Sequence, residues 1–326
     1  MIQADVTPMI GHDDAWKTWR NGIALGRLHH GWILAGREGL GKATFARAAA
    51  AEWVSEAGAK QPAPESHPDI LFITPLAASD DDARKQAEGK PYALKRSISV
   101  DQVRLMQRRL VTRPTLGYRR AVIIDSADLL EKSAVNALLK SLEEPPQGTV
   151  FLLVAHRPGR LLATIRSRCQ VMRFVLLDAK DLTRVLDETL SAADSATRAS
   201  LIQMAAGSPG AAMAFADLNL GKAAALFTRL LENGDANLSL RSELSSALGQ
   251  RSSREAQMAA IEAARRLLVT RLPLASPNER LCIADVHQQL VQLGAQAPTY
   301  NFDSGLLLME IGGLLASVGA SREGTS

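Results

Sequence analysis

The chain has 326 residues, the length of about two to three domains, and its 46% hydrophobic and 22% charged residues are those of a globular protein, not of a disordered or fibrous one. Its 7 Phe, 4 Trp and 3 Tyr are few for a protein that binds single strands by base stacking, and a net charge of +4 does not by itself indicate nucleic-acid binding. Two cysteines, Cys169 and Cys282, exclude a disulfide framework and a four-cysteine zinc site. The first residues lack the pattern of a signal peptide, and the apolar stretch near the end is too short for a membrane span. We therefore expect a cytoplasmic protein with no membrane partner.

Predicted helices and strands alternate over the first part of the chain. Apolar runs predict strands, and apolar residues at helical spacing predict the helices between them. The strands are expected at residues 32–35, 70–73, 121–124 and 150–155. The helices are expected at residues 12–28, 42–54, 100–111 and 132–142, with Val111 on the buried face of the third, and loops at residues 55–68 and 77–96. This alternation predicts an α/β fold with a parallel sheet and helices on both of its faces.

The strand pattern ends after Phe174. Residues 178–216 are predicted to form a small helical unit with a turn at residues 207–210, and residues 219–326 are predicted to be helical throughout. We therefore expect three domains, an α/β domain of residues 1–177, a small helical domain of residues 178–218 and a helical C-terminal domain of residues 219–326.

Residues 36–43 read GREGLGKA, which fits the phosphate-loop pattern G-x-x-x-x-G-K between a predicted strand and a predicted helix. Backbone N–H groups of such a loop surround phosphate oxygens, and its lysine reaches the β- and γ-phosphates. The Ser or Thr that binds Mg²⁺ is replaced by Ala43, and Thr44 lies about 100° further around the helix. The alternative is a tight turn with an ordinary surface lysine. The candidate nucleotide-binding residues are Gly36, Gly39, Gly41, Lys42, Thr44 and Asp125, in a degenerate site that requires no cofactor and leaves open whether ATP or ADP binds.

The strand at residues 121–124 ends in Asp125, which has the position of a Walker B aspartate that orients Mg²⁺. An ATPase of this type needs a carboxylate next in the chain to polarise water, but Ser126 stands there, and Asp128 lies two residues further on. Both defects predict that the chain does not hydrolyse ATP on its own. A core strand ending in a capping aspartate is the alternative.

Two further motifs are more specific. Residues 136–146 read NALLKSLEEPP, and residues 164–170 read TIRSRCQ. Together, downstream of a phosphate loop, they resemble the bacterial clamp-loader subunits of the AAA+ superfamily. The resemblance covers the α/β domain and the small helical domain, which in that family is a lid. It reaches the last hundred residues only by length and helicity, and there it implies a collar that joins subunits.

The defects are similar to those of the non-hydrolysing, delta-prime type of subunit of DNA polymerase III. A sensor arginine of the motor subunits is matched by Gly210, and His156 stands at the first sensor position. The resemblance implies a hetero-pentamer with gamma/tau and delta subunits, a sliding clamp and primer–template DNA as partners. The alternative is an active gamma/tau-like ATPase in which Thr44 and Asp128 replace the lost groups. A small-molecule kinase is disfavoured, because nothing resembles an acceptor site.

The resemblance assigns an arginine finger to Arg168, which would act in trans on the ATP of a neighbouring subunit. The alternative is an arginine in a local salt bridge. Cys169 beside it is expected to be a small buried side chain. Many relatives carry a zinc module after the phosphate-loop helix, but residues 51–70 contain no cysteine, and His67 alone cannot replace it, so no zinc is predicted.

Residues 84–120 contain 11 basic residues against Glu88 and Asp101. Some of these side chains, Arg108 and Arg109 among them, could contact DNA phosphates without reading bases. A solvated helix face, or an acidic partner surface, explains the same charge equally well.

Overall fold

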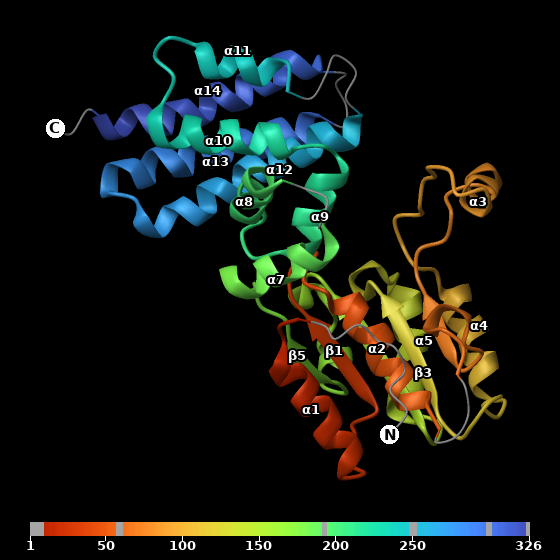
Figure 1. Ribbon diagram of the computed structural model, residues 1–326. Helices are drawn as coiled ribbons and strands as arrows, with labels where there is room; N and C mark the ends of the chain where they lie inside the picture. Colours follow the sequence, from red (N-terminus) through yellow and green to blue (C-terminus); the bar gives the residue numbers. More distant parts are fainter. Residues whose placement is uncertain (1–9, 57–60, 191–193, 248–252, 298–301, 324–326) are drawn as a thin grey trace. The chain divides into compact units, whose positions relative to one another are not determined.

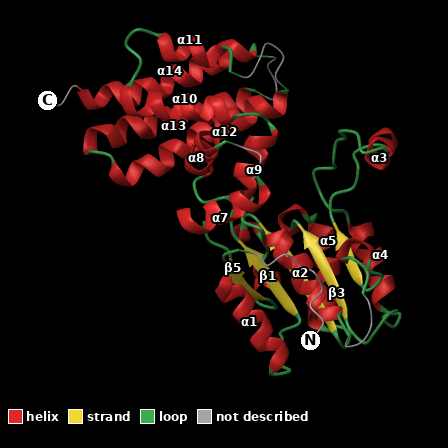
Figure 2. Cartoon of the chain, in the orientation of Figure 1, coloured by secondary structure: helices red, strands yellow, loops and turns green. Residues whose placement is uncertain are grey.

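The computed structural model describes residues 10–56, 61–190, 194–247, 253–297 and 302–323. The chain divides into two compact units, Met1–Val175 and Leu176–Ser326 (Figure 1). The first unit contains a sheet with helices around it, and the second is helical in its described part (Figure 2). The expected division into three domains, residues 1–177, 178–218 and 219–326, stays a prediction.

The first unit is built on a five-stranded parallel sheet with the order β2-β3-β4-β1-β5. Its strands are β1 (Gly31–Ala35), β2 (Ile70–Ile73), β3 (Arg120–Asp125), β4 (Thr149–Ala155) and β5 (Gln170–Arg173). Its helices are α1 (Asp13–Ala24), α2 (Lys42–Val54), α3 (Asp80–Ala87), α4 (Val100–Leu110), α5 (Lys132–Glu143) and α6 (Ala163–Arg166). The four predicted strands and the α/β fold class are confirmed.

Alternate residues of β1, β2, β3 and β4 enter two different hydrophobic cores. Trp32 and Leu34 of β1 lie in the core formed with α1 and α2, whereas Ile33 and Ala35 lie in the core formed with α4 and α5. Both faces of the central strands are thus covered, which explains why β1 and β4 read as continuous apolar runs. The carboxyl ends of the parallel strands share one edge of the sheet, and the loops that follow β1, β3 and β4 meet there.

Three local predictions were wrong. Residues 77–96 include α3, an eight-residue helix that Ser79 caps, since the Ser79 side chain accepts a hydrogen bond from the Asp82 amide. This helix buries none of its residues, so its sequence contains no apolar stripe that would predict a helix. The edge strand β5 was missed because only Met172 of its four residues is buried. Val111 is 89% exposed, because α4 already ends at Leu110.

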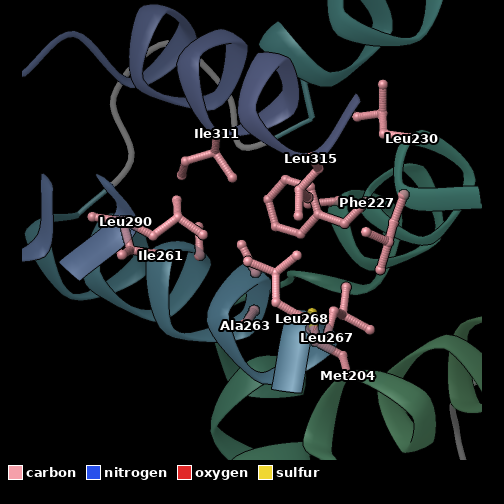
Figure 3. Close-up of a cluster of buried hydrophobic side chains, with 14 of the residues drawn as sticks. Met204, Phe227, Leu230, Ile261, Ala263, Leu267, Leu268, Leu290, Ile311 and Leu315 are labelled. Atoms are coloured by element: carbon pink, nitrogen blue, oxygen red, sulfur yellow. The ribbon is translucent and has the colours of Figure 1, made fainter. Parts of the chain in front are cut away.

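The second unit consists of helices around one large hydrophobic cluster. They are α7 (Ala179–Thr189), α8 (Ser195–Ala205), α9 (Pro209–Asp217), α10 (Gly221–Asn233), α11 (Ser239–Ser245), α12 (Arg254–Arg271), α13 (Pro277–Gln296) and α14 (Ser304–Glu323). Phe227 of α10, Leu268 of α12 and Leu315 of α14 point toward one another in this cluster (Figure 3). A smaller cluster joins α7, α8 and α9.

Helix α14 is long and apolar enough, over Ser304–Ser321, to cross a membrane by length and composition alone. Half of this segment is buried, and Leu308, Ile311 and Leu315 belong to the large cluster. A core helix passes the same test, so the finding is weak evidence for a membrane span.

Candidate nucleotide site and arginine edge

The loop between β1 and α2 has a backbone that three glycines make possible. Gly39 and Gly41 have φ angles of 80° and 81°, in the left-handed region that favours glycine. A Cβ on Gly36 would lie 2.4 Å from the carbonyl oxygen of Phe174, which is too close for any other residue. The backbone of the loop therefore turns tightly just before the N-terminus of α2, which is the geometry that a phosphate-binding loop requires.

The Lys42 side chain is buried at the beginning of α2, with 2% of the residue exposed. Its ammonium group donates a hydrogen bond of 2.5 Å to the carbonyl oxygen of Arg37, inside the loop. Burial lowers the pKa of Lys42 to about 8, although Asp125, Glu38 and Asp128 act in the opposite direction. The alternative interpretation, an ordinary surface lysine, is therefore wrong, since Lys42 is buried against its own loop and interacts electrostatically with Asp125 at the end of β3.

The two residues proposed as substitutes for the lost catalytic groups are placed differently. Thr44 is exposed and does not belong to the buried face of α2. Asp128 is tied to the backbone after β4, because its Oδ2 accepts hydrogen bonds from the amides of His156 (2.7 Å) and Arg157 (3.0 Å). Asp128 thus joins the turn after β3 to the end of β4, a structural task that the sequence did not indicate.

Asp125 lies at the end of β3, in register with Val154 of β4, and the next residue, Ser126, is buried. A serine hydroxyl is not a base at neutral pH, so this position supplies no group that polarises water. In the second unit, Gly210 is the second residue of α9, and the buried Ser208 caps that helix through the Ala211 amide. Gly210 therefore contributes no side chain to the beginning of this helix.

The structure gives His67 a local role. Its Nε2 lies 2.8 Å from Oε1 of Gln61, and its Nδ1 accepts a hydrogen bond from the Asp69 amide. Burial lowers the pKa of His67, which favours the neutral ring. Across the described ranges of the chain, no group of three or more His, Cys, Asp or Glu side chains could hold a metal ion.

Arg168 follows α6 and precedes β5, at the edge of the sheet beside β1. A third of its side chain is exposed, and one of its guanidinium nitrogens, Nη2, lies 2.5 Å from Oε1 of Glu143, the last residue of α5. This ion pair joins the two motifs that carry the family resemblance. Glu143 lies within the motif at residues 136–146, but no pattern along the chain indicates that this motif meets the one at residues 164–170, so no role for Glu143 is predicted from the sequence.

Cys169 is packed against the first residue of β1, where a Cβ on Gly31 would lie 2.9 Å from its Sγ. Burial raises the pKa of the Cys169 thiol to about 12, so the reactive thiolate form is scarce at neutral pH. Cys169 is partly buried and packs against the core formed with α4 and α5, which agrees with a small packing side chain rather than a nucleophile.

The basic segment of residues 84–120 is not a uniform patch. Arg120 is buried, lies 3.7 Å from Asp69, and donates hydrogen bonds to three backbone carbonyl oxygens between residues 109 and 113. Acidic neighbours pair with Lys85, Lys90 and Arg104. Arg108 and Arg109 lie exposed on α4, so only part of the formal charge of this segment faces solvent without an acidic partner in the described chain.

Comparison with known proteins gives a consistent family. A family model described as DNA polymerase III, delta subunit, matches residues 11–178. The delta-prime subunit of DNA polymerase III from Pseudomonas aeruginosa is 37% identical over 155 residues, which cover 43% of this chain and 41% of the relative. The delta-prime subunit from Escherichia coli is 40% identical over 124 residues, covering 38% and 37% of the two chains. The tau subunit from Escherichia coli is 29% identical over 188 residues, covering 56% of this chain and 27% of the relative.

A crystal structure of a DNA polymerase III gamma subunit-related protein from Thermotoga maritima is similar in fold, with a TM-score of 0.50 and 18% identity over 93% of this chain and 99% of that one. The alignments span less than half the length of each of these three curated relatives. The family model, in contrast, covers half of this chain and includes the phosphate loop and both specific motifs. The chain therefore belongs to the DNA polymerase III delta-subunit family, the bacterial clamp-loader family that its motifs resemble.

Proposed function

We propose that this chain is a non-hydrolysing, delta-prime-type subunit of the DNA polymerase III clamp loader, which presents Arg168 as an arginine finger to the ATP of a neighbouring subunit. One contrast carries the proposal. The chain's own site has lost the side chains of hydrolysis, while Arg168 keeps a part-exposed guanidinium at the sheet edge. A guanidinium presented across a subunit boundary stabilises the charge that develops on the transferred phosphoryl group.

Three substitutions support the loss of hydrolysis. Ala43 has no hydroxyl for Mg²⁺, Ser126 has no carboxylate for water, and Gly210 has no charge for the phosphates. The two candidate substitutes do not offer equivalent groups, since Thr44 is exposed and Oδ2 of Asp128 accepts hydrogen bonds from two backbone amides. The proposed function needs no cofactor or zinc in this chain, and binding of ATP or ADP to the loop at residues 36–41 would be a property separate from catalysis.

The proposed partners come from the names of the relatives, which are delta-prime, tau and gamma subunits of DNA polymerase III. We assign to this chain a place in a hetero-pentamer with gamma/tau and delta subunits, which opens a sliding clamp and places it on primer–template DNA in the cytoplasm. The apolar surface left exposed in the second unit, such as Leu274 at 76% and Leu281 at 74%, supplies contact area for such a collar.

The decisive experiment compares two substitutions in an assembly reconstituted with gamma and delta subunits of the same organism. Arg168→Ala should lower the DNA-stimulated ATPase rate of the assembly by about 10³-fold at the site it serves, the usual effect of an arginine finger. Lys42→Ala should leave that rate unchanged, and Arg166→Ala, an exposed arginine of the same segment, is the matched control. An assembly indifferent to Arg168→Ala removes the arginine finger. Robust turnover by the purified chain that Lys42→Ala abolishes would establish the gamma/tau-like alternative.

Contact with DNA phosphates is a separate part of the proposal. Arg108 and Arg109 are exposed on α4, so charge reversal of both should weaken DNA binding by the assembly and reduce the salt slope of log K by about 2. Charge reversal of Lys17 and Arg27, which are exposed around α1 on the other side of the sheet, is the control. An unchanged slope excludes these two arginines as phosphate contacts.

A further inference from the structure

The guanidinium of Arg168 is held by three acceptors of its own subunit. Its Nη2 lies 2.5 Å from Glu143 Oε1, and its Nη1 donates to the carbonyl oxygen of Thr164 at 3.0 Å and to the hydroxyl of Ser167 at 3.3 Å. A guanidinium has five N–H groups in a rigid plane. Contacts within the described chain use three of them, so two N–H groups remain for a further acceptor while the plane is already fixed.

The backbone beneath this side chain is fixed as well. The Arg168 amide donates to the carbonyl oxygen of Ile165 at 3.0 Å, and two residues later Gln170 pairs with Trp32 as β5 joins β1. A Cβ on Gly31 would lie 3.3 Å from the Arg168 carbonyl oxygen, which shows how closely β1 approaches. Because this packing fixes the backbone of Arg168, only its side-chain torsions could still vary. The three acceptors restrict these torsions.

Glu143 occupies an unfavourable place for a carboxylate. It is the last residue of α5, where the carbonyl end of the helix dipole is negative and favours a cation. Arg168 supplies that cation, and its guanidinium compensates both the dipole and the carboxylate. The neighbouring Glu144 is exposed, and its side chain makes no hydrogen bond or ion pair with any residue that the structure describes, so the two glutamates of the motif differ sharply in their contacts.

We propose that Glu143 is a positioning residue, which holds the Arg168 guanidinium in the orientation that meets the ATP of the neighbouring subunit. This inference rests on the proposed arginine finger. A long side chain that is ordered before assembly loses less conformational entropy when it contacts a phosphoryl group, and small errors in its placement are costly in rate. Glu143 touches no reacting atom and acts only through Arg168.

The first test measures ATP turnover by the reconstituted assembly. Glu143→Ala should lower kcat about 10-fold, with KM for ATP changed less than about twofold, because only the orientation of the finger is lost. Glu143→Gln, whose amide oxygen still accepts a hydrogen bond, should restore most of the rate. Glu144→Ala is the matched control and should turn over like the parent chain.

The same assay separates this inference from the proposed function. In the Arg168→Ala background, Glu143→Ala should have no further effect, since the residue acts only through the arginine. If Arg168→Ala lowers turnover and Glu143→Ala leaves it unchanged, the positioning role is overturned while the finger stands. Faster turnover with Glu143→Ala also overturns the positioning role, because Glu143 would then keep Arg168 away from the ATP of the neighbouring subunit.

The second test needs no partner subunit. In the isolated chain, NMR relaxation of the Arg168 Nε–H group should show a rigid side chain, and Glu143→Ala should lower its order parameter below about 0.6. Glu143→Gln should preserve most of the rigidity, and the Nε–H of the exposed Arg166 serves as the flexible reference. An order parameter that Glu143→Ala does not change overturns the inference, even if the assembly assay fails for other reasons.

Discussion

Arg120 and Arg168 both pair with a carboxylate in the α/β unit, but the two pairs lie in different surroundings. Arg120 is buried with Asp69, and together they bond the backbone of residues 109–116. The side chains of Arg168 and Glu143 are 34% and 47% exposed, and the arginine keeps N–H groups for another acceptor. The same kind of ion pair can therefore stabilise the fold where it is buried, and can remain available for a partner where it is exposed.

The largest expected effect is on the buried pair. Arg120→Ala leaves Asp69 charged in the interior and removes the donor to three carbonyl oxygens, so it should lower the free energy of unfolding by about 3–5 kcal/mol. Urea unfolding of the isolated chain, followed by circular dichroism, measures this loss. A loss below about 1 kcal/mol would show that Arg120 stabilises the fold no more than a surface arginine does, which would contradict the difference between the buried and the exposed pair.

Lys42 is a second buried cation, but its ammonium group donates a hydrogen bond to a carbonyl oxygen rather than to a carboxylate. Its pKa is about 8 in the folded chain and about 10.4 in the unfolded one, so between these values the unfolded chain binds more protons. Stability should therefore rise with pH over this window, by at most about 3 kcal/mol, and the cost of the buried charge is fully present below pH 8.

Lys42→Met should abolish this rise, which urea unfolding at pH 7, 8, 9 and 10 would show as a difference between the two chains. Because other lysines and the tyrosines titrate in both chains, only the difference is diagnostic. Parallel pH profiles would mean that Lys42 keeps an ordinary pKa in the folded state.

A smaller effect is expected at Asp128, a carboxylate that bonds backbone amides as Asp69 does. Asp128→Ala removes the acceptor of the His156 and Arg157 amides and should lower the free energy of unfolding by about 2 kcal/mol, without changing ATP turnover of the assembly. Thermal and urea unfolding measure the first outcome. Loss of turnover in a stably folded Asp128→Ala chain would show instead that this carboxylate takes part in catalysis.

The smallest effect on stability is expected for the exposed pair. Arg168→Ala should change the free energy of unfolding by less than about 1 kcal/mol, because solvent screens a pair with this exposure. The chain would thus remain folded while the assembly loses its finger. A loss comparable to that of Arg120→Ala would place Arg168 among the structural residues.

Local patterns were sufficient to predict the central strands and the glycine-rich turn between β1 and α2, because each is a continuous segment whose burial or backbone geometry leaves a mark on neighbouring residues. Elements without such a mark were missed. Helix α3 buries no side chain, and β5 buries only Met172. The motif around Arg168 was identifiable by resemblance, but its contact with Glu143 joins residues 25 positions apart and has no periodic signature.

The sequence by itself determined the α/β architecture and the residue types that stand at the positions of the proposed nucleotide site and the proposed finger. These depend on which residue types occur, and Ala43, Ser126 and Gly210 lack the required atoms in any conformation. Only the tertiary structure decided that Lys42 is buried, that Asp128 bonds the backbone after β4, that Arg120 is buried with Asp69 and that Glu143 forms an ion pair with Arg168. The reason is physical: burial and pairing depend on which distant segments the sheet brings together, and this is a property of packing rather than of local pattern.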